Sequence, residues 1–308
     1  MSLLKVDNLK VHYPIRGGIF RTVVDHVRAV DGISFELNEG ETYGLIGESG
    51  SGKSTAGKAI LQLTQATNGS IKFLDNDLIT LNKKQMRAFR QEIQMIFQDP
   101  YSSLNPKKRI IDLVAEPLRN YETLTEEEER EKVLYYLNKV GLSPESLYKY
   151  PHEFSGGQRQ RIGIARALTL QPKLIVADEP VSALDVSVQA QVLNFLQDLQ
   201  EEFKLTYLFI GHDLGVIRHL CDRIGVMYRG RLVEEGTTED ILNNPQHIYT
   251  KRLIAAIPDI RPEFREEKIK ERQEVRKEYQ QNASSYFDEN GRPFDLKPIS
   301  DTHRVALP

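Results

Sequence analysis

The chain has 308 residues, of which 28% are charged and 40% hydrophobic, and its formal net charge of −3 gives no overall basic field for nucleic acid. The single cysteine, Cys221, excludes an intrachain disulfide and any metal site built on several cysteines. The cysteine count fits a reduced, cytoplasmic location. No apolar stretch approaches the roughly 18 residues of a membrane span and the first residues contain no signal-peptide core, so we expect any action at a membrane to depend on another chain.

The first predicted strand covers residues 3–13, where apolar side chains alternate up to Tyr13. An aromatic ring at this point could stack on adenine, and an ordinary sheet aromatic is the other interpretation. Residues 14–28 are expected to form a looped insertion. Residues 29–37 predict a second strand that ends in a turn.

A glycine-rich loop of the pattern G-x-x-x-x-G-K-S follows the strand-like residues 41–46 and precedes a predicted helix over 54–63. The glycines permit backbone conformations that turn successive N–H groups toward an anion. The lysine places a cation on the β- and γ-phosphates, and the serine hydroxyl can bind Mg²⁺. The predicted phosphate-binding residues are Gly47, Glu48, Ser49, Gly50, Ser51, Gly52, Lys53, Ser54 and Thr55.

The next predicted elements are a strand at 71–74, a helix at 83–90 and an apolar strand at 93–97 that ends at Gln98. Residues 99–106 contain two prolines and cannot form regular structure. We expect this segment to lie on the surface and to display Tyr101 and Leu104. Residues 110–141 have helical spacing, with a capping-box pattern at 125–128 and a stop at Gly141.

A second glycine-rich helix start, Ser155-Gly156-Gly157-Gln158, opens a predicted helix that runs to residue 170. Backbone N–H groups at a helix start can bind an anion, although this site lacks the lysine of the first loop. Taken alone, the pattern fits an ordinary capped helix equally well.

Asp178 and Glu179 follow a fully apolar strand at 173–177, as expected for a strand buried in a parallel sheet. A carboxylate at this strand end can bind Mg²⁺ beside a phosphate loop, and the next one can orient or deprotonate water. His212 lies just beyond the apolar strand 205–210. Its position at the end of a strand is equivalent to the positions of Asp178 and Gln98.

The rest of the chain predicts a hairpin at 224–234 and a helix-rich segment at 237–257 that ends at Pro258. Residues 262–281 fit a solvated helix or a partly disordered tail, and we favour the helix. Residues 282–308 carry little signal.

Together these motifs resemble the ATP-binding subunits of ABC transporters over roughly residues 3–258. The resemblance implies an α/β P-loop NTPase (RecA-like) core with a mixed sheet, an antiparallel β subdomain and an inserted α-helical subdomain at about 99–168. It also implies an ATP-binding domain at 1–240 and a C-terminal extension at 241–308.

The resemblance assigns roles to the motif residues, with ATP and Mg²⁺ as substrate and metal. Glu179 is implied as the catalytic base, Gln98 as the sensor of Mg²⁺ and attacking water, and His212 as a γ-phosphate contact. The implied Mg²⁺ ligands are Ser54, Gln98 and Asp178. The implied ATP-binding residues are Tyr13, residues 47–55, Ser155, Gly156, Gly157, Gln158 and, in the turn 182–185, Asp185.

In this family Ser155 to Gln158 would cap an ATP held by the phosphate loop of a second subunit. Phe154 stands where leucine is commoner, and Gly211 and Gly215 flank His212 at positions where the family pattern differs. We expect both glycines to loosen that turn without removing a ligand.

A narrower resemblance, to the second of two unlike ATPase subunits in oligopeptide and dipeptide importers, is carried by residues 97–106, 151–161, 177–191 and 244–258. It implies a related ATPase partner, two transmembrane permease subunits, indirect action of an extracytoplasmic peptide-binding protein, no nucleic acid, and a peripheral location at the cytoplasmic face of the membrane. Dipeptide, nickel or oligosaccharide cargo, or a role in a carbon–phosphorus lyase complex, are the alternatives. Chromosome and DNA-repair ATPases are excluded, because the roughly 100 residues between the two glycine-rich motifs leave no room for a coiled coil.

Overall fold

The computed structural model describes residues 2–101, 103–257 and 265–308. The chain forms two compact units, which are described separately. The first unit contains Asn38–Glu41 and Thr80–Phe209, and the second contains Ser2–Leu37, Thr42–Ile79 and Ile210–Pro308.

The first unit is built on buried parallel strands. β6 (Ile93–Ile96) pairs in parallel with β7 (Leu174–Asp178), with Ile93 opposite Leu174. β8 (Thr206–Gly211) is the next strand in the order. Every residue of β7 and β8 is buried, which explains their continuous apolar sequences.

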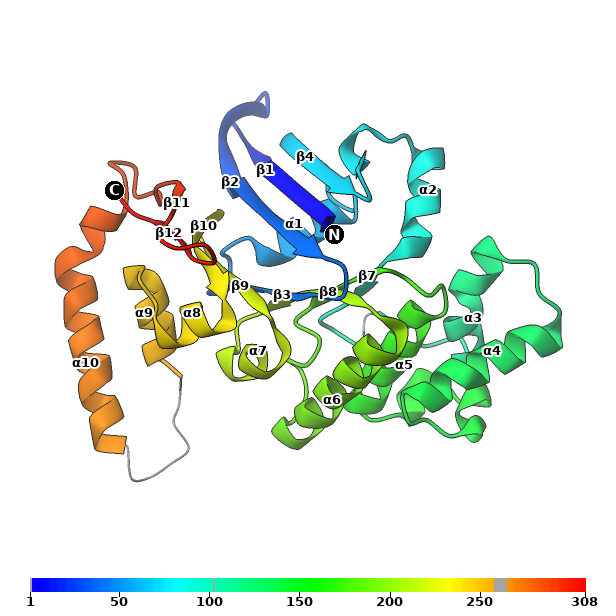
Figure 1. The fold of residues 1–308 in the computed structure, drawn as a ribbon. Helices are drawn as coiled ribbons and strands as arrows, with labels where there is room; N and C mark the ends of the chain where they lie inside the picture. The colour runs from blue at the N-terminus through cyan, green and yellow to red at the C-terminus, as the bar shows by residue number, and fades with distance from the viewer. Residues whose placement is uncertain (1, 102, 258–264) are drawn as a thin grey trace. The chain divides into compact units, whose positions relative to one another are not determined.

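Helices make up most of the rest of this unit (Figure 1). The helical stretch expected at 110–141 consists of two helices, because a second helix begins after Thr125. The side chains and amides of Thr125 and Glu128 form the predicted capping box there. Gly141 has φ +68° just beyond the second helix, as a helix stop requires. The helices are α2 (Lys83–Glu92), α3 (Ile110–Tyr121), α4 (Glu126–Lys139), α5 (Gly156–Leu168) and α6 (Val186–Phe203), with 3₁₀ turns at Pro144–Tyr148 and Pro151–Glu153.

The second unit contains an antiparallel sheet of order β2-β1-β4-β5. Its strands are β1 (Ser2–Gly17), β2 (Thr22–Asn38), β4 (Asn68–Phe73) and β5 (Asn76–Asp77). The prediction of a looped insertion at 14–28 is wrong, because β1 and β2 extend through it as a hairpin. Gly18 and Arg21 take positive φ values at its tip, and the β-branched residues beyond it favour the extended backbone.

The second unit also contributes five strands of the 8-stranded mixed sheet, in the order β11-β12-β10-β9-β3. β3 (Thr42–Ile46) is parallel to β9 (Arg223–Tyr228), whereas β10 (Arg231–Thr237) pairs antiparallel with β9, as the predicted hairpin requires. The helices of this unit are α1 (Lys53–Ile60), α7 (Leu214–Leu220), α8 (Thr238–Asn243), α9 (Ile248–Ala255) and α10 (Arg265–Asn282). The predicted solvated helix is thus confirmed over 265–282, while its first residues and Pro258 lie outside the described residues.

The last residues of the chain form two strands that the sequence did not reveal. β12 (Arg304–Ala306) pairs with β10, and β11 (Leu296–Pro298) pairs with β12. Val305 and Ala306 are fully buried there. Within the part of the chain that the structure describes, we find no helix with the length and apolar character of a membrane span.

Candidate nucleotide-binding site

The loop between β3 and α1 has a backbone that only glycine can follow. Gly47, Gly50 and Gly52 have φ values of +151°, +81° and +106°. A Cβ at Gly47 would lie 2.2 Å from the carbonyl oxygen of Met227, and one at Gly52 would lie 2.0 Å from that of Ala29. At Gly50 a Cβ would meet nothing within 4 Å. Two glycines are therefore required by close packing and the third by its backbone conformation.

Lys53, at the first turn of α1, is buried and lies across this loop. Its Nζ donates to the carbonyl oxygens of Gly47 at 2.8 Å and Glu48 at 2.9 Å and lies 3.4 Å from Ser51 Oγ. The cap residue Gly52 has no side chain to occupy the helix start. A buried ammonium beside a glycine loop and a helix N-terminus is a donor set that fits the phosphates of a nucleotide.

The other residues predicted for this loop lie at its surface or in α1. Glu48 and Ser49 are exposed, Ser51 is buried, and Ser54 and Thr55 are half-buried in the first turn of the helix. The carbonyl of Ser51 accepts the amide of Gly230, which ties the loop to the β9–β10 turn. Tyr13 lies on β1 with 43% of its surface exposed, so its ring is accessible to a ligand.

In the first unit the structure brings Gln98 and Glu179 together. Nε2 of Gln98 donates to the Glu179 carboxylate at 2.9 Å. Asp178 is buried as the last residue of β7, and Glu179 directly after it has φ +47°. The left-handed conformation costs a non-glycine residue about 1–2 kcal/mol, so the surrounding structure holds this carboxylate in a strained position.

The start of α5 is a self-capped helix. The hydroxyl of Ser155 accepts the Gln158 amide at 3.3 Å, and Oε1 of Gln158 accepts the Ser155 amide at 2.9 Å. A Cβ at Gly157 would lie 2.2 Å from Cγ1 of Val188, whereas one at Gly156 would lie 3.4 Å from Leu184. Ser155 itself is exposed.

The turn before α6 packs against this helix start. Asp185 is the exposed N-cap residue of α6, and its carbonyl accepts the amides of Val188 and Gln189 at 2.9 Å. The side chain of Gln189 donates back to the carbonyls of Val181 and Leu184, at 3.1 and 3.0 Å. These bonds fix the turn that carries Asp185.

The segment after Gln98 is irregular, as predicted, but only one of the two side chains expected on its surface is exposed. Tyr101 is 60% exposed, with the guanidinium of Arg159 4.1 Å from the centre of its ring. Leu104 is only 2% exposed, so the prediction that it is displayed is wrong. An irregular segment without strand or helix bonds needs an apolar anchor, and Leu104 provides it while Arg166 donates to the carbonyl of Ser103 at 2.8 Å.

His212 is exposed directly after β8, in the second unit. The next residue, Asp213, is the N-cap of α7 and accepts the Gly215 amide at 2.8 Å. Gly215 therefore takes part in a defined helix cap, although we expected it to loosen this turn.

Two residues of α9 that touch the phosphate loop, Tyr249 and Arg252, were not predicted from the sequence. Both contact Glu48, about 200 positions earlier in the chain. No local sequence pattern predicts such a contact, because the residue spacing around Glu48 is independent of the residue spacing in α9.

Comparisons with known proteins agree with this arrangement. Residues 30–182 match the family described as ABC transporter, and residues 233–292 match the oligopeptide/dipeptide transporter C-terminal region. The chain is 50% identical over its full length to the oligopeptide transport ATP-binding protein OppF of Lactococcus lactis, covering 96% of it. It is 52% identical to the oligopeptide transport ATP-binding protein AppF of Bacillus subtilis over 83% of this chain and 78% of that protein.

Solved structures of ABC transporter components are also similar to this chain, at lower sequence identity. The dimeric, post-hydrolysis ATP-binding cassette MJ0796, bound to ADP and Pi, is 28% identical with a TM-score of 0.68, over 76% of this chain and 98% of that one. The structure of cbiO1 from Clostridium perfringens, part of the ABC transporter complex cbiONQ, is 27% identical with a TM-score of 0.69, over 82% of this chain and 95% of that one. The expected P-loop fold with its mixed and antiparallel sheets is confirmed.

Proposed function

The chain belongs to the family of oligopeptide and dipeptide transport ATP-binding proteins within the ABC transporters, and we propose that it binds and hydrolyses ATP to energise oligopeptide import. The observation that carries the nucleotide part is the buried ammonium of Lys53 in its glycine loop. The names of relatives about half identical in sequence support the peptide cargo.

ATP is held, in this proposal, by residues 47–55, with the adenine against Tyr13 and the γ-phosphate against His212. Ser54, Gln98 and Asp178 would hold Mg²⁺, whose charge neutralises the phosphate oxygens. Oxygen ligands of this kind are those that Mg²⁺ prefers.

Glu179 is proposed as the general base that accepts a proton from the attacking water. Gln98 supports this role, because its side-chain amide donates to the carboxylate and so limits the orientations that the carboxylate can take. The strained backbone of Glu179 is also typical of a residue held in place for chemistry.

The assembly that we propose pairs this chain with a related ATPase. Ser155, Gly156, Gly157, Gln158 and Asp185 would face the ATP bound by the partner, and the partner's equivalent residues would face this chain's loop. The head-to-tail pair would bind two transmembrane subunits at the cytoplasmic face of the membrane, with a peptide-binding protein on the other side. The exposed Tyr101 is the candidate contact with a transmembrane subunit.

The experiment that tests hydrolysis is the substitution Glu179→Gln in the assembled complex. The amide retains an oxygen that can accept from Gln98 but cannot take a proton, so we expect hydrolysis to fall by about 10²–10⁴-fold with ATP binding retained. Glu201→Gln, an exposed glutamate on α6, is the matched control. Turnover of the Glu179 variant near the parental rate would assign the base to another group.

Peptide cargo is tested separately by deleting the gene and measuring uptake of defined peptides. Loss of oligopeptide uptake, restored by the parental chain but not by the Glu179 variant, is the expected result. Uptake at the parental rate, with no related ATPase substituting, would reject peptide cargo.

A further inference from the structure

The C-terminal region holds the phosphate loop at Glu48, through both the main chain and the side chain. The backbone N–H of Glu48 donates to the hydroxyl of Tyr249 at 3.0 Å. The carboxylate of Glu48 accepts from Nη2 of Arg252 at 2.6 Å. Tyr249 and Arg252 lie on α9, one turn apart, so one short helix makes both contacts.

The two side chains of α9 are themselves fixed by aromatic packing. Tyr249 is fully buried, with its ring 4.5 Å from the ring of Tyr228 at the end of β9. The guanidinium of Arg252 lies 5.3 Å from the Tyr249 ring and 4.3 Å from the ring of Tyr279 on α10. Burial raises the pKa of Tyr249, so its hydroxyl stays protonated and neutral.

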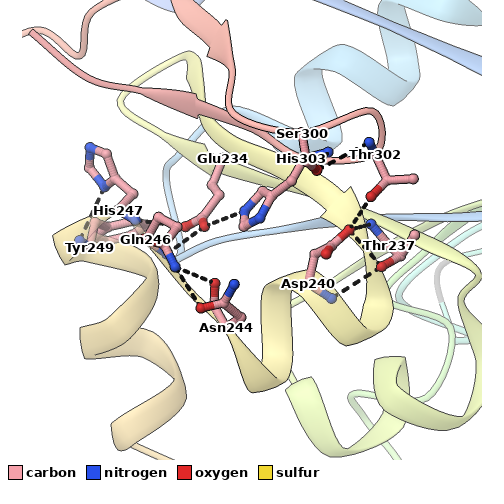
Figure 2. Close-up of polar contacts among 10 residues, drawn as sticks. All are labelled: Glu234, Thr237, Asp240, Asn244, Gln246, His247, Tyr249, Ser300, Thr302 and His303. Carbon is pink, nitrogen blue, oxygen red and sulfur yellow. Dashed lines mark hydrogen bonds and ion pairs between the residues drawn. The ribbon is translucent and has the colours of Figure 1, made fainter.

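The N-terminal end of α9 is set by a buried carboxylate, Glu234 of β10 (Figure 2). Glu234 accepts the amides of Gln246 at 2.7 Å and His247 at 3.0 Å, and its Oε1 lies 2.7 Å from Nε2 of His303. His303 comes from the segment between β11 and β12, so the end of the chain takes part in placing this helix. A carboxylate at a helix start also suits the helix dipole.

The ring of His247 also fixes the first turn of α9. Nδ1 of His247 accepts the amide of Tyr249 at 3.1 Å, as Figure 2 shows. Burial lowers the pKa of His247 to about 4, so the ring is neutral near pH 7 and its Nδ1 can accept. At the other end of α9, Arg272 of α10 donates to the carbonyls of Ala255 and Ile257, each at 2.8 Å. The helix is therefore held at both ends.

From this geometry we propose that Tyr249 and Arg252 are positioning residues for ATP binding: they hold the phosphate loop, through Glu48, in the conformation that receives the phosphates. The inference rests on the proposed role of this loop. A loop that is already ordered binds its ligand more tightly, because binding does not have to order it. Arg252 also balances the carboxylate of Glu48, which would otherwise repel the phosphates.

The test is equilibrium binding of a fluorescent ATP analogue with Mg²⁺ to the full chain. Tyr249→Phe keeps the ring and removes the acceptor of the Glu48 amide, so we expect the Kd to rise by about 3- to 10-fold. Tyr207→Phe is the matched control, because Tyr207 is equally buried and its hydroxyl donates to the carbonyl of Leu196 at 3.2 Å, away from the loop. It should lower the melting temperature similarly and leave the Kd unchanged.

The charge contact is tested by rescue. Arg252→Gln should raise the Kd by about 2- to 5-fold, the scale of a partly exposed ion pair. Adding Glu48→Gln to that variant removes the uncompensated carboxylate and should bring the Kd back toward the parental value. A helix that merely stabilised the fold would give no such recovery.

A third variant separates this inference from the proposed function. Lys53→Ala should abolish most binding, and unchanged binding would reject the loop as the nucleotide site. If Lys53→Ala loses binding while Tyr249→Phe binds as tightly as Tyr207→Phe, the loop is the site and the positioning role of α9 is overturned.

Discussion

The two glycine-rich helix starts, Gly52 before α1 and Ser155 before α5, are built in opposite ways. The cap residue of α1 is a glycine in the left-handed region, pressed against the carbonyl of Ala29. The cap residue of α5 is a serine with extended backbone, whose own hydroxyl accepts the amide of Gln158. The start of α1 is thus shaped by neighbouring backbone, whereas the start of α5 is shaped by the side chains of that helix itself.

This difference shows why the two motifs suit different tasks. The α1 start has no side chain at its cap and a lysine beside it, so it can surround phosphates with N–H groups and positive charge. The α5 start is satisfied by its own cap, but a hydroxyl that accepts one hydrogen bond still has a proton to donate. Ser155 is exposed, so that proton is accessible to a ligand from outside the helix.

The largest effect is expected for Gly52→Ala in the phosphate loop. The new methyl group would lie 2.0 Å from a backbone oxygen, at a φ of +106°, so the loop has to move and ATP-analogue affinity should fall by about 100-fold or more. Gly50→Ala is the control, because it adds only backbone strain of about 1–2 kcal/mol and no clash. Equal losses in the two variants would show that backbone conformation alone shapes the loop.

Gly157→Ala should have an intermediate effect, on stability only. Its methyl group would lie 2.2 Å from Cγ1 of Val188, which is a side chain that can partly shift, so we expect a loss of about 1–3 kcal/mol in unfolding free energy. Thermal unfolding measures this, and adding Val188→Ala should recover most of the loss. Gly156→Ala, with an ordinary 3.4 Å contact, should change little. A drop in ATP affinity of the isolated chain would contradict the separation of the two motifs.

The smallest stability effect is expected for Ser155→Ala, which removes one helix cap worth about 1 kcal/mol. Ser155→Asp should keep the cap and so restore the melting temperature. In the assembled complex both variants should lose ATPase activity, because alanine has no proton to donate and aspartate is an anion facing a phosphate. Full activity in the aspartate variant would mean that Ser155 acts only as a cap.

The sequence predicted what depends on local order along the chain. The glycine loop, the Thr125 cap and the apolar strand before Asp178 are each specified within a few residues, and the structure places all three as predicted. The strand ends before Gln98 and Asp178 were also predicted, whereas the hydrogen bond between Gln98 and Glu179 is seen only in the structure.

What the sequence could not predict depends on distant partners. Leu104 looked exposed because its irregular segment gives no periodicity from which to infer burial. The need for glycine at position 157 comes from Val188, and the strand at 304–306 is too short and mixed to stand out until it pairs with β10. The same limit hid the contact of Tyr249 with Glu48.

The two short strands at the end of the chain also bear on aggregation. An unpaired strand edge can template pairing with other chains, and β12 covers the edge of β10 that would otherwise be open. β11, which becomes the outer strand, is only 3 residues long and carries Lys297 and Pro298, two residues that discourage further pairing. Variants truncated before β11 would expose the edge of β10 and should therefore be prone to self-association, even with an intact phosphate loop.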